Sequence, residues 1–284
     1  MTSTDSIANT NQNGYPNKML MQIERRITFI IGKDGFAAWK LNRLKTLSSY
    51  FRSVVIIQNI TNQLHANAEH TLKVMTIACQ QNHLCQLWIE GSDAELACMV
   101  LTDFIADQFE IVNTAHRKTE EFSYSVIGTH PTFALPFSIT YSYKKIADKS
   151  IEKYALLSKL CTMLNARNAQ PIFDAMLKRE AIATTYIGHG IALPHVMIEG
   201  VSQPSLAIMK LDTSIDWHSP RGDVNTIIAV LIPSSADMTI IKACTQLTRR
   251  LIDVDFCHLL TSTVEPEAFK AILLHVMSRT YQKP

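Results

Sequence analysis

The sequence has no segment typical of a membrane protein or of a disulfide-stabilised secreted protein. Its longest apolar run, at residues 226–232, is far shorter than the about 20 residues of a membrane-spanning helix. The first 17 residues are rich in Ser, Thr and Asn, without the apolar core of a signal peptide. Six cysteines occur but no Cys-x-x-Cys pair, which favours buried free thiols over disulfides or zinc. We therefore expect a cytoplasmic protein with a flexible tail at residues 1–20, and without a metal or cofactor.

The chain also carries little charge. Charged residues make up 18% of it and the formal net charge is +2, too small to argue for nucleic acid or an acidic membrane surface as a partner. Hydrophobic residues make up 47%, which excludes a disordered protein. At 284 residues, the length favours two domains over one.

The apolar pattern is interrupted between about residues 113 and 140. A charged run at 116–121 is followed by Gly128, Pro131 and Pro136, residues that punctuate loops. The pattern is clear on both sides of this stretch. It predicts one domain over residues 21–112, a linker over 113–136 and a second domain over 137–284.

The N-terminal half alternates between strand-like and helix-like segments. A capping box at Ser92 and Glu95 predicts the start of a helix with Leu96, Met99, Val100, Ile105 and Phe109 on one side. The pattern predicts an α+β open-faced sandwich, with helices on one face of an antiparallel sheet. The strands are expected at 27–31, 53–58 and 84–90, and the other helices at 37–50 and 68–78.

The C-terminal half predicts an α/β domain. Asp237 is a candidate N-cap for a helix reaching Leu251, and Pro171 and Pro266 suit first helical turns. Strands are expected at 206–211 and 226–232, and helices at 150–164, 171–179, 237–251 and from 266 onward.

The most informative stretch runs from Gly188 to His195 and reads Gly-His-Gly-Ile-Ala-Leu-Pro-His. Its two glycines allow a positive φ or a close backbone approach before a short apolar strand. Pro194 restricts the chain entering His195, so the imidazole is held on a stiff support. Three upstream residues are candidate phosphate donors, although a surface charge and two strand-forming threonines are the alternative interpretation: Arg179, Thr184 and Thr185.

This residue set suits a phosphohistidine site. A neutral imidazole is a competent nucleophile near pH 7 because its ordinary pKa lies close by. The incoming phosphoryl group spreads negative charge over its oxygens, and a guanidinium, a hydroxyl and backbone N–H groups can stabilise that charge. The pattern therefore favours His195 as a phosphoryl acceptor.

The stretch resembles the Gly-x-Gly-Ile-Ala-[Ile/Leu/Val]-Pro-His signature of phosphotransferase-system enzyme IIA (EIIA) domains of the fructose, mannitol and nitrogen-regulatory type. The resemblance runs from about residue 137 to 278 and includes Arg179-Glu180 and the Ile232-Pro233 strand end. It implies a mixed sheet flanked by helices and phosphorylation by a histidine phosphocarrier. By this resemblance, His195 is the acceptor and Arg179 stabilises the phosphate.

One position departs from that family. The family commonly has a second histidine at the start of the helix after the Pro-ended strand, and the matching residue here is Ile240. Lys242 is cationic, but a residue two positions after Ile240 on a helix points to roughly the opposite side of that helix. His189, between the two glycines, is either a substitute or a tolerated loop residue. The departure implies slower transfer or a mainly regulatory module.

The N-terminal half resembles the histidine phosphocarrier HPr over about residues 25–110. In that family, Gly-Leu-His-Thr-Arg-Pro-Ala holds the phosphorylated histidine at a helix N-terminus. The matching segment here, Gly35 to Leu41, has Ala37 in place of the nucleophile and Trp39 in place of the arginine. The resemblance therefore implies a degenerate copy that cannot carry phosphate. We expect it to dock within the chain or to compete with authentic carriers.

Three functions remain open from the sequence. The leading one is a phosphorylation-responsive regulatory protein, with a histidine phosphocarrier (HPr or its nitrogen-type paralogue) and a regulated protein as partners. The second is a phosphoryl carrier to a IIB domain in fructose- or mannitol-type sugar uptake. The third is a binding scaffold that is not phosphorylated. None of the three requires membrane insertion or nucleic acid.

Overall fold

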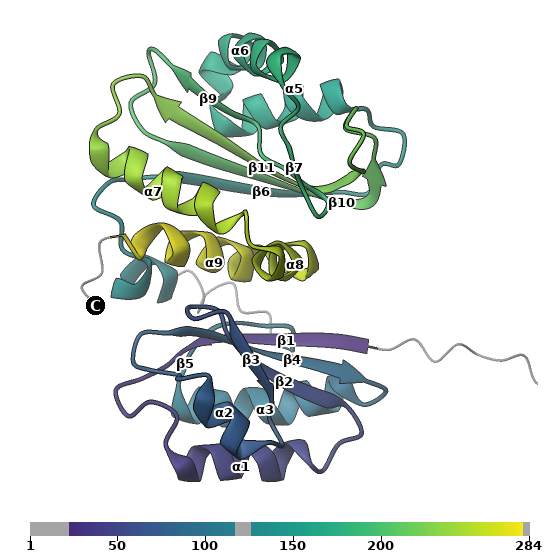
Figure 1. Ribbon diagram of the computed structural model, residues 1–284, viewed down its shortest axis with the longest axis vertical. Helices are drawn as coiled ribbons and strands as arrows, with labels where there is room; N and C mark the ends of the chain where they lie inside the picture. Colours follow the sequence, from purple (N-terminus) through teal and green to yellow (C-terminus); the bar gives the residue numbers. More distant parts are fainter. Residues whose placement is uncertain (1–22, 117–125, 281–284) are drawn as a thin grey trace, which may run out of the picture.

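The N-terminal half folds around an antiparallel five-stranded sheet with the strand order β3-β2-β4-β1-β5. The computed structural model describes residues 23–116 and 126–280 (Figure 1), so the predicted tail at 1–20 and most of the charged run at 116–121 lie outside the described residues. The strands are β1 (Ile23–Ile30), β2 (Val54–Asn59), β3 (Leu64–Asn67), β4 (Leu84–Gly91) and β5 (Glu110–Thr114).

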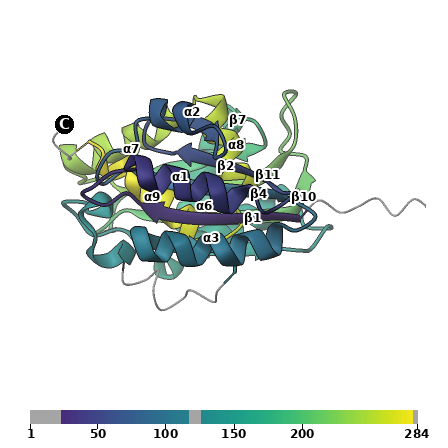
Figure 2. The ribbon, with the colours of Figure 1, turned by 90° about the horizontal axis from the view of Figure 1, so that it is seen from below.

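Three helices cover one face of this sheet: α1 (Ala38–Ser48), α2 (Thr71–Thr76) and α3 (Ala94–Gln108). Seen from below, α1 and α3 run roughly parallel to β1 (Figure 2). Alternate residues of β1 explain the layering, because Ile27 and Phe29 join the core beneath the helices whereas Ile30 faces the opposite way. The predicted α+β sandwich is confirmed.

The capping box predicted at the start of α3 is wrong. The N-cap is Asp93, and its carboxylate accepts hydrogen bonds from the backbone N–H groups of Arg52 and Ser53, each at 2.8 Å, instead of capping the helix. Glu95 forms an ion pair with Arg25 on β1. The acidic side chains at this helix start therefore bind neighbouring strands and loops.

The C-terminal half contains a six-stranded mixed sheet. Its main path has the strand order β6-β10-β11-β8-β7, and β9 pairs with β11 beside it. The contacts of β6 with β10 and of β11 with β8 and β9 are parallel, whereas β10 with β11 and β7 with β8 are antiparallel. The strands are β6 (Thr140–Ile146), β7 (Tyr186–Gly188), β8 (Ile191–Ala192), β9 (His195–Ile198), β10 (Ser205–Ile215) and β11 (Val224–Pro233).

Helices cover both faces of this sheet, which confirms the predicted α/β architecture. On one face, α5 and α6 pack on Ala207 and Ala229, and on the other, α7, α8 and α9 pack on Ile208 and Ile228. Asp237 caps α7 as predicted, because its carboxylate accepts from the N–H groups of Thr239 and Ile240 at 3.0 and 3.1 Å. The helices are α5 (Lys153–Leu164), α6 (Ala169–Ile182), α7 (Met238–Arg250), α8 (Val254–Ser262) and α9 (Pro266–Ser278).

The second face of the N-terminal sheet is covered by the C-terminal domain. Ile30, Ile60 and Leu84 belong to the same apolar core as residues of α8 and α9, which lie between the two sheets (Figure 1). Thr61 Oγ1 lies 2.8 Å from Nε2 of His275, and Arg250 donates a hydrogen bond to the Ile60 carbonyl at 3.2 Å. The degenerate domain thus docks within the chain through its sheet, while α1 lies on the far side.

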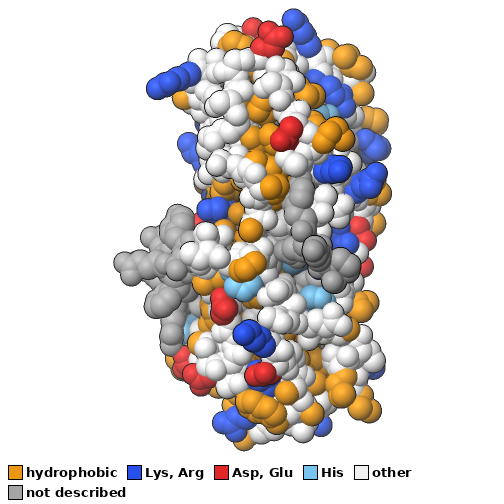
Figure 3. All heavy atoms as spheres, turned by 90° about the vertical axis from the view of Figure 1, so that its left-hand side faces the viewer, with side chains coloured by type: hydrophobic (Ala, Val, Ile, Leu, Met, Phe, Trp, Pro, Cys, Tyr) orange, Lys and Arg blue, Asp and Glu red, His pale blue; other side chains and the backbone are white. Residues whose placement is uncertain are grey.

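Histidines are concentrated near this junction, and Figure 3 shows several close to the level where the domains meet. Burial, and then the charge of Arg279, lowers the pKa of His275 to about 3. Burial also lowers the pKa of His83 and of His130. Burial at this junction therefore favours the neutral form of all three imidazoles.

The segment between the sheets is partly packed. Ile127 and Phe133 are buried in the core that includes α9, and residues 131–133 form a short 3-10 helix. The proposed bounds of the linker, 113–136, and of the two domains remain a prediction.

Candidate phosphoryl-acceptor site

His195 is the first residue of β9, and its ring lies at the surface. Leu193, Pro194 and Val196 around it are buried, whereas His195 and Met197 are exposed, because alternate residues of a strand point to opposite sides. Parallel pairing with β11 places His195 opposite Val230. Strand pairing and proline together hold this residue at the edge of a rigid sheet.

The ring of His195 is oriented by its own backbone. Nδ1 lies 2.9 Å from the Leu193 carbonyl oxygen. A carbonyl oxygen can only accept, so Nδ1 must carry the hydrogen of that bond. In the neutral ring the lone pair is then on Nε2, on the opposite edge of the imidazole. Nε2 is therefore the ring nitrogen that could act as a nucleophile.

The two glycines form a tight hairpin turn between β7 and β8. His189 and Gly190 have φ values of 51° and 76°, the pattern of a two-residue turn with left-handed central residues. A Cβ at Gly190 would lie 3.2 Å from the Asn225 side chain. The expected positive φ and close approach are both present at Gly190.

His189 does not substitute for a second active-site histidine. Its ring contacts that of His258 on α8, with a centroid distance of 5.4 Å. The hairpin pairs with β11 at Thr226, whereas His195 pairs at Val230. Four strand residues span roughly 13 Å, so the two histidines serve different parts of the domain.

The other predicted site residues lie on the segment that ends α6 and leads into β7, and Thr185 connects it to the His195 loop. The Leu193 N–H donates to the Thr185 carbonyl at 2.9 Å, and Thr184 Oγ1 accepts from the Tyr186 N–H at 3.3 Å, which leaves the Thr184 hydroxyl proton available. Arg179, at the end of α6, donates to the Ala183 carbonyl at 3.0 Å. Since α6 also packs against β9, the guanidinium, the hydroxyl and the imidazole belong to one connected region.

A buried polar network supports this region, and the sequence interpretation missed it. Glu180 accepts from Lys153 Nζ at 2.8 Å and from the Thr185 N–H through both carboxylate oxygens. Trp217 donates from Nε1 to Thr185 Oγ1 at 3.2 Å, and its carbonyl accepts from Lys153 at 2.8 Å. The threonine step is thus fixed from three sides.

The electrostatics of this network favour the ionised carboxylate. Burial acts to raise the pKa of Glu180, but hydrogen bonds from Lys153 and Thr185 outweigh it, so the pKa is lowered from its ordinary 4.5. The side chains of Lys153 and Glu180 are only 6% and 9% exposed. The position of Glu180 directly after Arg179 in the sequence could have indicated its role in this network. Nothing in the sequence indicated that Trp217 takes part.

Comparison with known sequences places both halves of the chain. The profile described as "Phosphoenolpyruvate-dependent sugar phosphotransferase system, EIIA 2" matches residues 144–276, and "PTS HPr component phosphorylation site" matches residues 25–107. The nitrogen regulatory protein of Pseudomonas aeruginosa is 30% identical over 112 residues, which cover 39% of this chain and 73% of that protein. This chain belongs to the EIIA type-2 family.

Other similar proteins differ more in length or sequence. The multiphosphoryl transfer protein of Shigella flexneri is 28% identical over 112 residues, 39% of this chain, and the chain spans only 14% of its length. The crystal structure of nitrogen regulatory protein IIA-Ntr from Neisseria meningitidis is 21% identical with a TM-score of 0.41, covering 46% of this chain and 92% of that one.

Within this EIIA domain, the residue in place of the usual second histidine lies on a partly buried surface. Ile240 is in the first turn of α7 and packs against the apolar core shared by α7, α8 and α9. Lys242 is exposed. This position of α7 therefore contributes packing and no imidazole.

The HPr-like domain lacks a nucleophile at the corresponding position. Ala37 is the N-cap of α1, and only its carbonyl takes part in hydrogen bonds, accepting from the N–H groups of Lys40 and Leu41. Trp39 is 58% exposed beside it. The Lys40 ammonium is occupied by the rings of Trp39 and Phe109, at 5.6 and 4.8 Å.

The described residues, 23–116 and 126–280, contain no group of three or more His, Cys, Asp or Glu side chains arranged to hold a metal ion. No helix among them is long and apolar enough to cross a membrane.

Proposed function

We propose that this EIIA protein accepts a phosphoryl group on Nε2 of His195 from a histidine phosphocarrier, in the cytoplasm. The observation that carries the proposal is the exposed imidazole whose Nδ1 hydrogen is bonded to the Leu193 carbonyl, which leaves the Nε2 lone pair outward. This arrangement supplies an oriented nucleophile before any partner arrives.

The reaction would be a direct transfer between two histidines. The Nε2 lone pair of His195 attacks the phosphorus of the donor's phosphohistidine, a P–N bond forms, and the donor imidazole leaves with its electron pair. Nδ1 retains its hydrogen and continues to donate it to the Leu193 carbonyl. The carbonyl oxygen stabilises the positive charge that develops on the ring. Arg179 and Thr184 are the proposed donors to the phosphoryl oxygens, since their backbone partners leave further N–H and O–H groups free for bonding.

We infer that the role is regulatory. The family's second histidine is replaced by a packed Ile240, and the attached HPr-like domain has Ala37 where a nucleophile is needed. Transfer onward would be less well supported than acceptance, so the phosphorylated state itself is the proposed signal for a partner protein. Onward transfer to a IIB domain is the alternative.

The test is a labelled-phosphate transfer assay. Full-length protein is incubated with phosphoenolpyruvate, enzyme I and each candidate phosphocarrier, and acid-labile phosphate on the chain is counted. His195→Ala should abolish labelling, and Arg179→Gln should slow it by about tenfold to a hundredfold because a charge-assisted hydrogen bond is lost. His189→Ala is the matched control, an exposed histidine of the neighbouring β7–β8 hairpin, and should label normally.

Two results would contradict the proposal. One is an unlabelled wild-type chain with every donor, and the other is full labelling of His195→Ala. Adding a IIB protein to the labelled chain separates the two roles, since rapid loss of label to a IIB cysteine or histidine favours the carrier over the regulator.

A further inference from the structure

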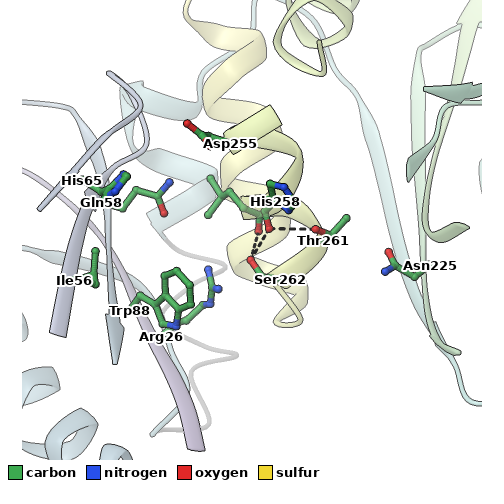
Figure 4. A pocket seen from close by; sticks show the side chains of 11 residues that line it. Arg26, Ile56, Gln58, His65, Trp88, Asn225, Asp255, His258, Thr261 and Ser262 are labelled. Carbon is green, nitrogen blue, oxygen red and sulfur yellow. Dashed lines mark hydrogen bonds between the residues drawn. The ribbon is translucent and has the colours of Figure 1, made fainter. Parts of the chain in front are cut away.

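A cavity of about 560 Å³ lies between the two domains. Figure 4 shows its two walls: Arg26, Ile56, Gln58, His65 and Trp88 on strands of the N-terminal sheet, and His258, Thr261 and Ser262 on α8. Asn225, at the start of β11, closes the far side. The cavity is therefore a product of domain docking, and neither domain forms it alone.

Two hydrogen-bond donors in the cavity wall lack an acceptor. Arg26 is 3% exposed, and it donates from Nε to Glu24 and from Nη1 to Gln86, each at 2.7 Å. Its Nη2 and the indole Nε1 of Trp88 have no hydrogen-bond partner among the described residues. The guanidinium lies 5.1 Å from the centroid of the Trp88 ring, so the two orphan donors share one wall. Buried donors are rarely left unpaired, which indicates a missing acceptor.

The charge around this wall is predominantly positive. Lys210 on β10 is buried, and its ammonium donates to Thr226 Oγ1 and to the Leu260 and Thr261 carbonyls at 2.9, 3.3 and 2.6 Å. No carboxylate within the described residues pairs with Lys210. Burial, and then the charge of Arg26, lowers the pKa of Lys210 to about 8. The two domains thus each contribute a buried cation near the junction, close enough for their charges to interact.

The available carboxylates do not neutralise both cations. Glu24 contacts Arg26 only at Nε and is 40% exposed. Asp255 is the acidic residue in the cavity lining, and Figure 4 shows it at the opposite end of α8 from Ser262, away from the Arg26–Trp88 wall. The donors and charges near that wall therefore fit an external anion.

We propose that this cavity binds a small anion, a carboxylate or phosphoryl compound, whose oxygens accept hydrogen bonds from Arg26 Nη2 and Trp88 Nε1. Figure 4 shows Ser262 of α8 beside this wall, whereas Asn225 and the ring of His258 lie on the side of α8 away from Arg26 and Trp88. An anion that binds only the docked arrangement of the two domains stabilises that arrangement. This site is separate from His195, and its occupancy does not depend on phosphorylation.

The cavity wall also contacts the hairpin that precedes His195. The Asn225 N–H donates to the Gly190 carbonyl at 2.9 Å, and His258 contacts the His189 ring. The far end of the cavity thus borders the hairpin that leads to the acceptor loop.

The chain offers a direct readout, because it contains only three tryptophans. The indole N–H signals of the full-length protein are followed by two-dimensional NMR during titration with sodium phosphate or sodium succinate, with sodium chloride at matched ionic strength. Trp88→Phe assigns the signal of interest. Trp39 is remote from the cavity and Trp217 already donates to Thr185, so their signals are internal references.

We expect a saturable shift of the Trp88 signal with phosphate, succinate or both, and unchanged signals from Trp39 and Trp217. Response to one anion alone identifies the phosphoryl or the carboxylate class. Arg26→Gln should weaken binding by about tenfold or more.

Three results would overturn the site. They are no Trp88 shift with either anion, an equal shift with sodium chloride, and a saturable shift that is unaffected by Arg26→Gln. Arg43→Gln, an exposed arginine of α1, is the charge-matched control and should bind normally. Repeating the titration in His195→Ala separates this site from the phosphoryl-acceptor proposal, since binding should persist there.

Discussion

The two domains each place a loop at the position where their families carry a phosphorylatable histidine, and the two loops differ in what surrounds that position. At His195 the ring is oriented by a carbonyl, and the adjoining threonine step is fixed by Glu180 and Trp217. At Ala37 the backbone still caps α1, but the side chain is a methyl group and the nearest cation, Lys40, is stacked on aromatic rings.

This difference shows that a backbone can be retained after its chemistry has gone. The N-terminal sheet is needed for packing, because Ile30, Ile60 and Leu84 complete the core beneath α8 and α9. Its loop at Ala37 lies at the other end of the helical layer and contributes nothing to that contact. The docking role of the domain therefore does not require a functional histidine loop.

The strongest way to break this comparison is to return a histidine to the degenerate loop. In a His195→Ala background, Ala37→His should accept phosphate at least about a thousandfold more slowly than wild type, because the loop lacks oriented donors as well as a nucleophile. Adding Trp39→Arg to this variant should recover part of the rate. The measurement is the initial rate of acid-labile labelling with enzyme I and phosphocarrier.

Labelling of the Ala37→His variant at the wild-type rate would mean that the two loops differ only in one side chain. A matched variant, His70→Ala in the same domain, controls for general effects of changing histidine content and should leave labelling of His195 unchanged.

The second largest effect concerns the buried Lys153–Glu180 pair, which supports the His195 region and has no counterpart described at Ala37. Lys153→Met leaves the buried Glu180 carboxylate without its cation, and we expect a loss of about 3 kcal/mol in the free energy of unfolding. Urea denaturation of the full chain, followed by circular dichroism, measures it. Lys178→Met, an exposed change on α6, is the control and should have little effect.

The same pair predicts a pH dependence. The folded pKa of Glu180 lies below its ordinary 4.5, so its contribution is present above pH 4.5 and is lost as the pH falls through the lower folded value. Lys153→Met should flatten this part of the stability profile. A variant with wild-type stability and the wild-type slope below pH 4.5 would show that the network does not hold the loop.

Sequence patterns predicted the fold where apolar periodicity was strong, and failed where an element is buried by segments distant in the sequence. The helices at 153–164 and 238–250 and the two long strands of the C-terminal sheet were all expected. By contrast, β6 is a tyrosine- and lysine-rich edge strand whose apolar contacts come from α9, and β3, β5 and α8 were missed as well. The predicted inward face of α3 was wrong at Leu96 and Met99, because Ala97, Cys98 and Leu101 face the sheet.

The residues of the candidate site also fall into two groups, those that a local pattern predicted and those that only the folded structure brings together. The short motif identified His195, the glycine turn and the nearby Arg179, because each has a local signature. Lys153, Glu180 and Trp217 meet only after three separate segments of the chain have folded together, and no local pattern pairs them. The same is true of Arg26 and Lys210, which belong to different domains and approach only across the docked interface.

The smallest effect should come from the β7–β8 turn that precedes His195. Two glycines with nearly equal φ allow the effect of the close approach to Asn225 to be separated from that of the left-handed backbone. Gly190 and Gly200 have φ values of 76° and 74°, but a Cβ at Gly190 would meet Asn225 at 3.2 Å whereas one at Gly200 would meet nothing within 4 Å. Gly200→Ala should therefore cost about 1 kcal/mol from its left-handed backbone alone, and Gly190→Ala about 2 kcal/mol.

Chemical denaturation and the initial labelling rate of His195 measure the two variants side by side. Only Gly190→Ala should also slow labelling, by a few-fold, because its carbonyl accepts from Asn225 and Thr226 and thereby positions the hairpin that leads to Pro194. Equal stability losses and equal rates for the two variants would mean that the close approach at Gly190 is incidental. The rigidity of the acceptor loop would then come from strand pairing and Pro194 alone.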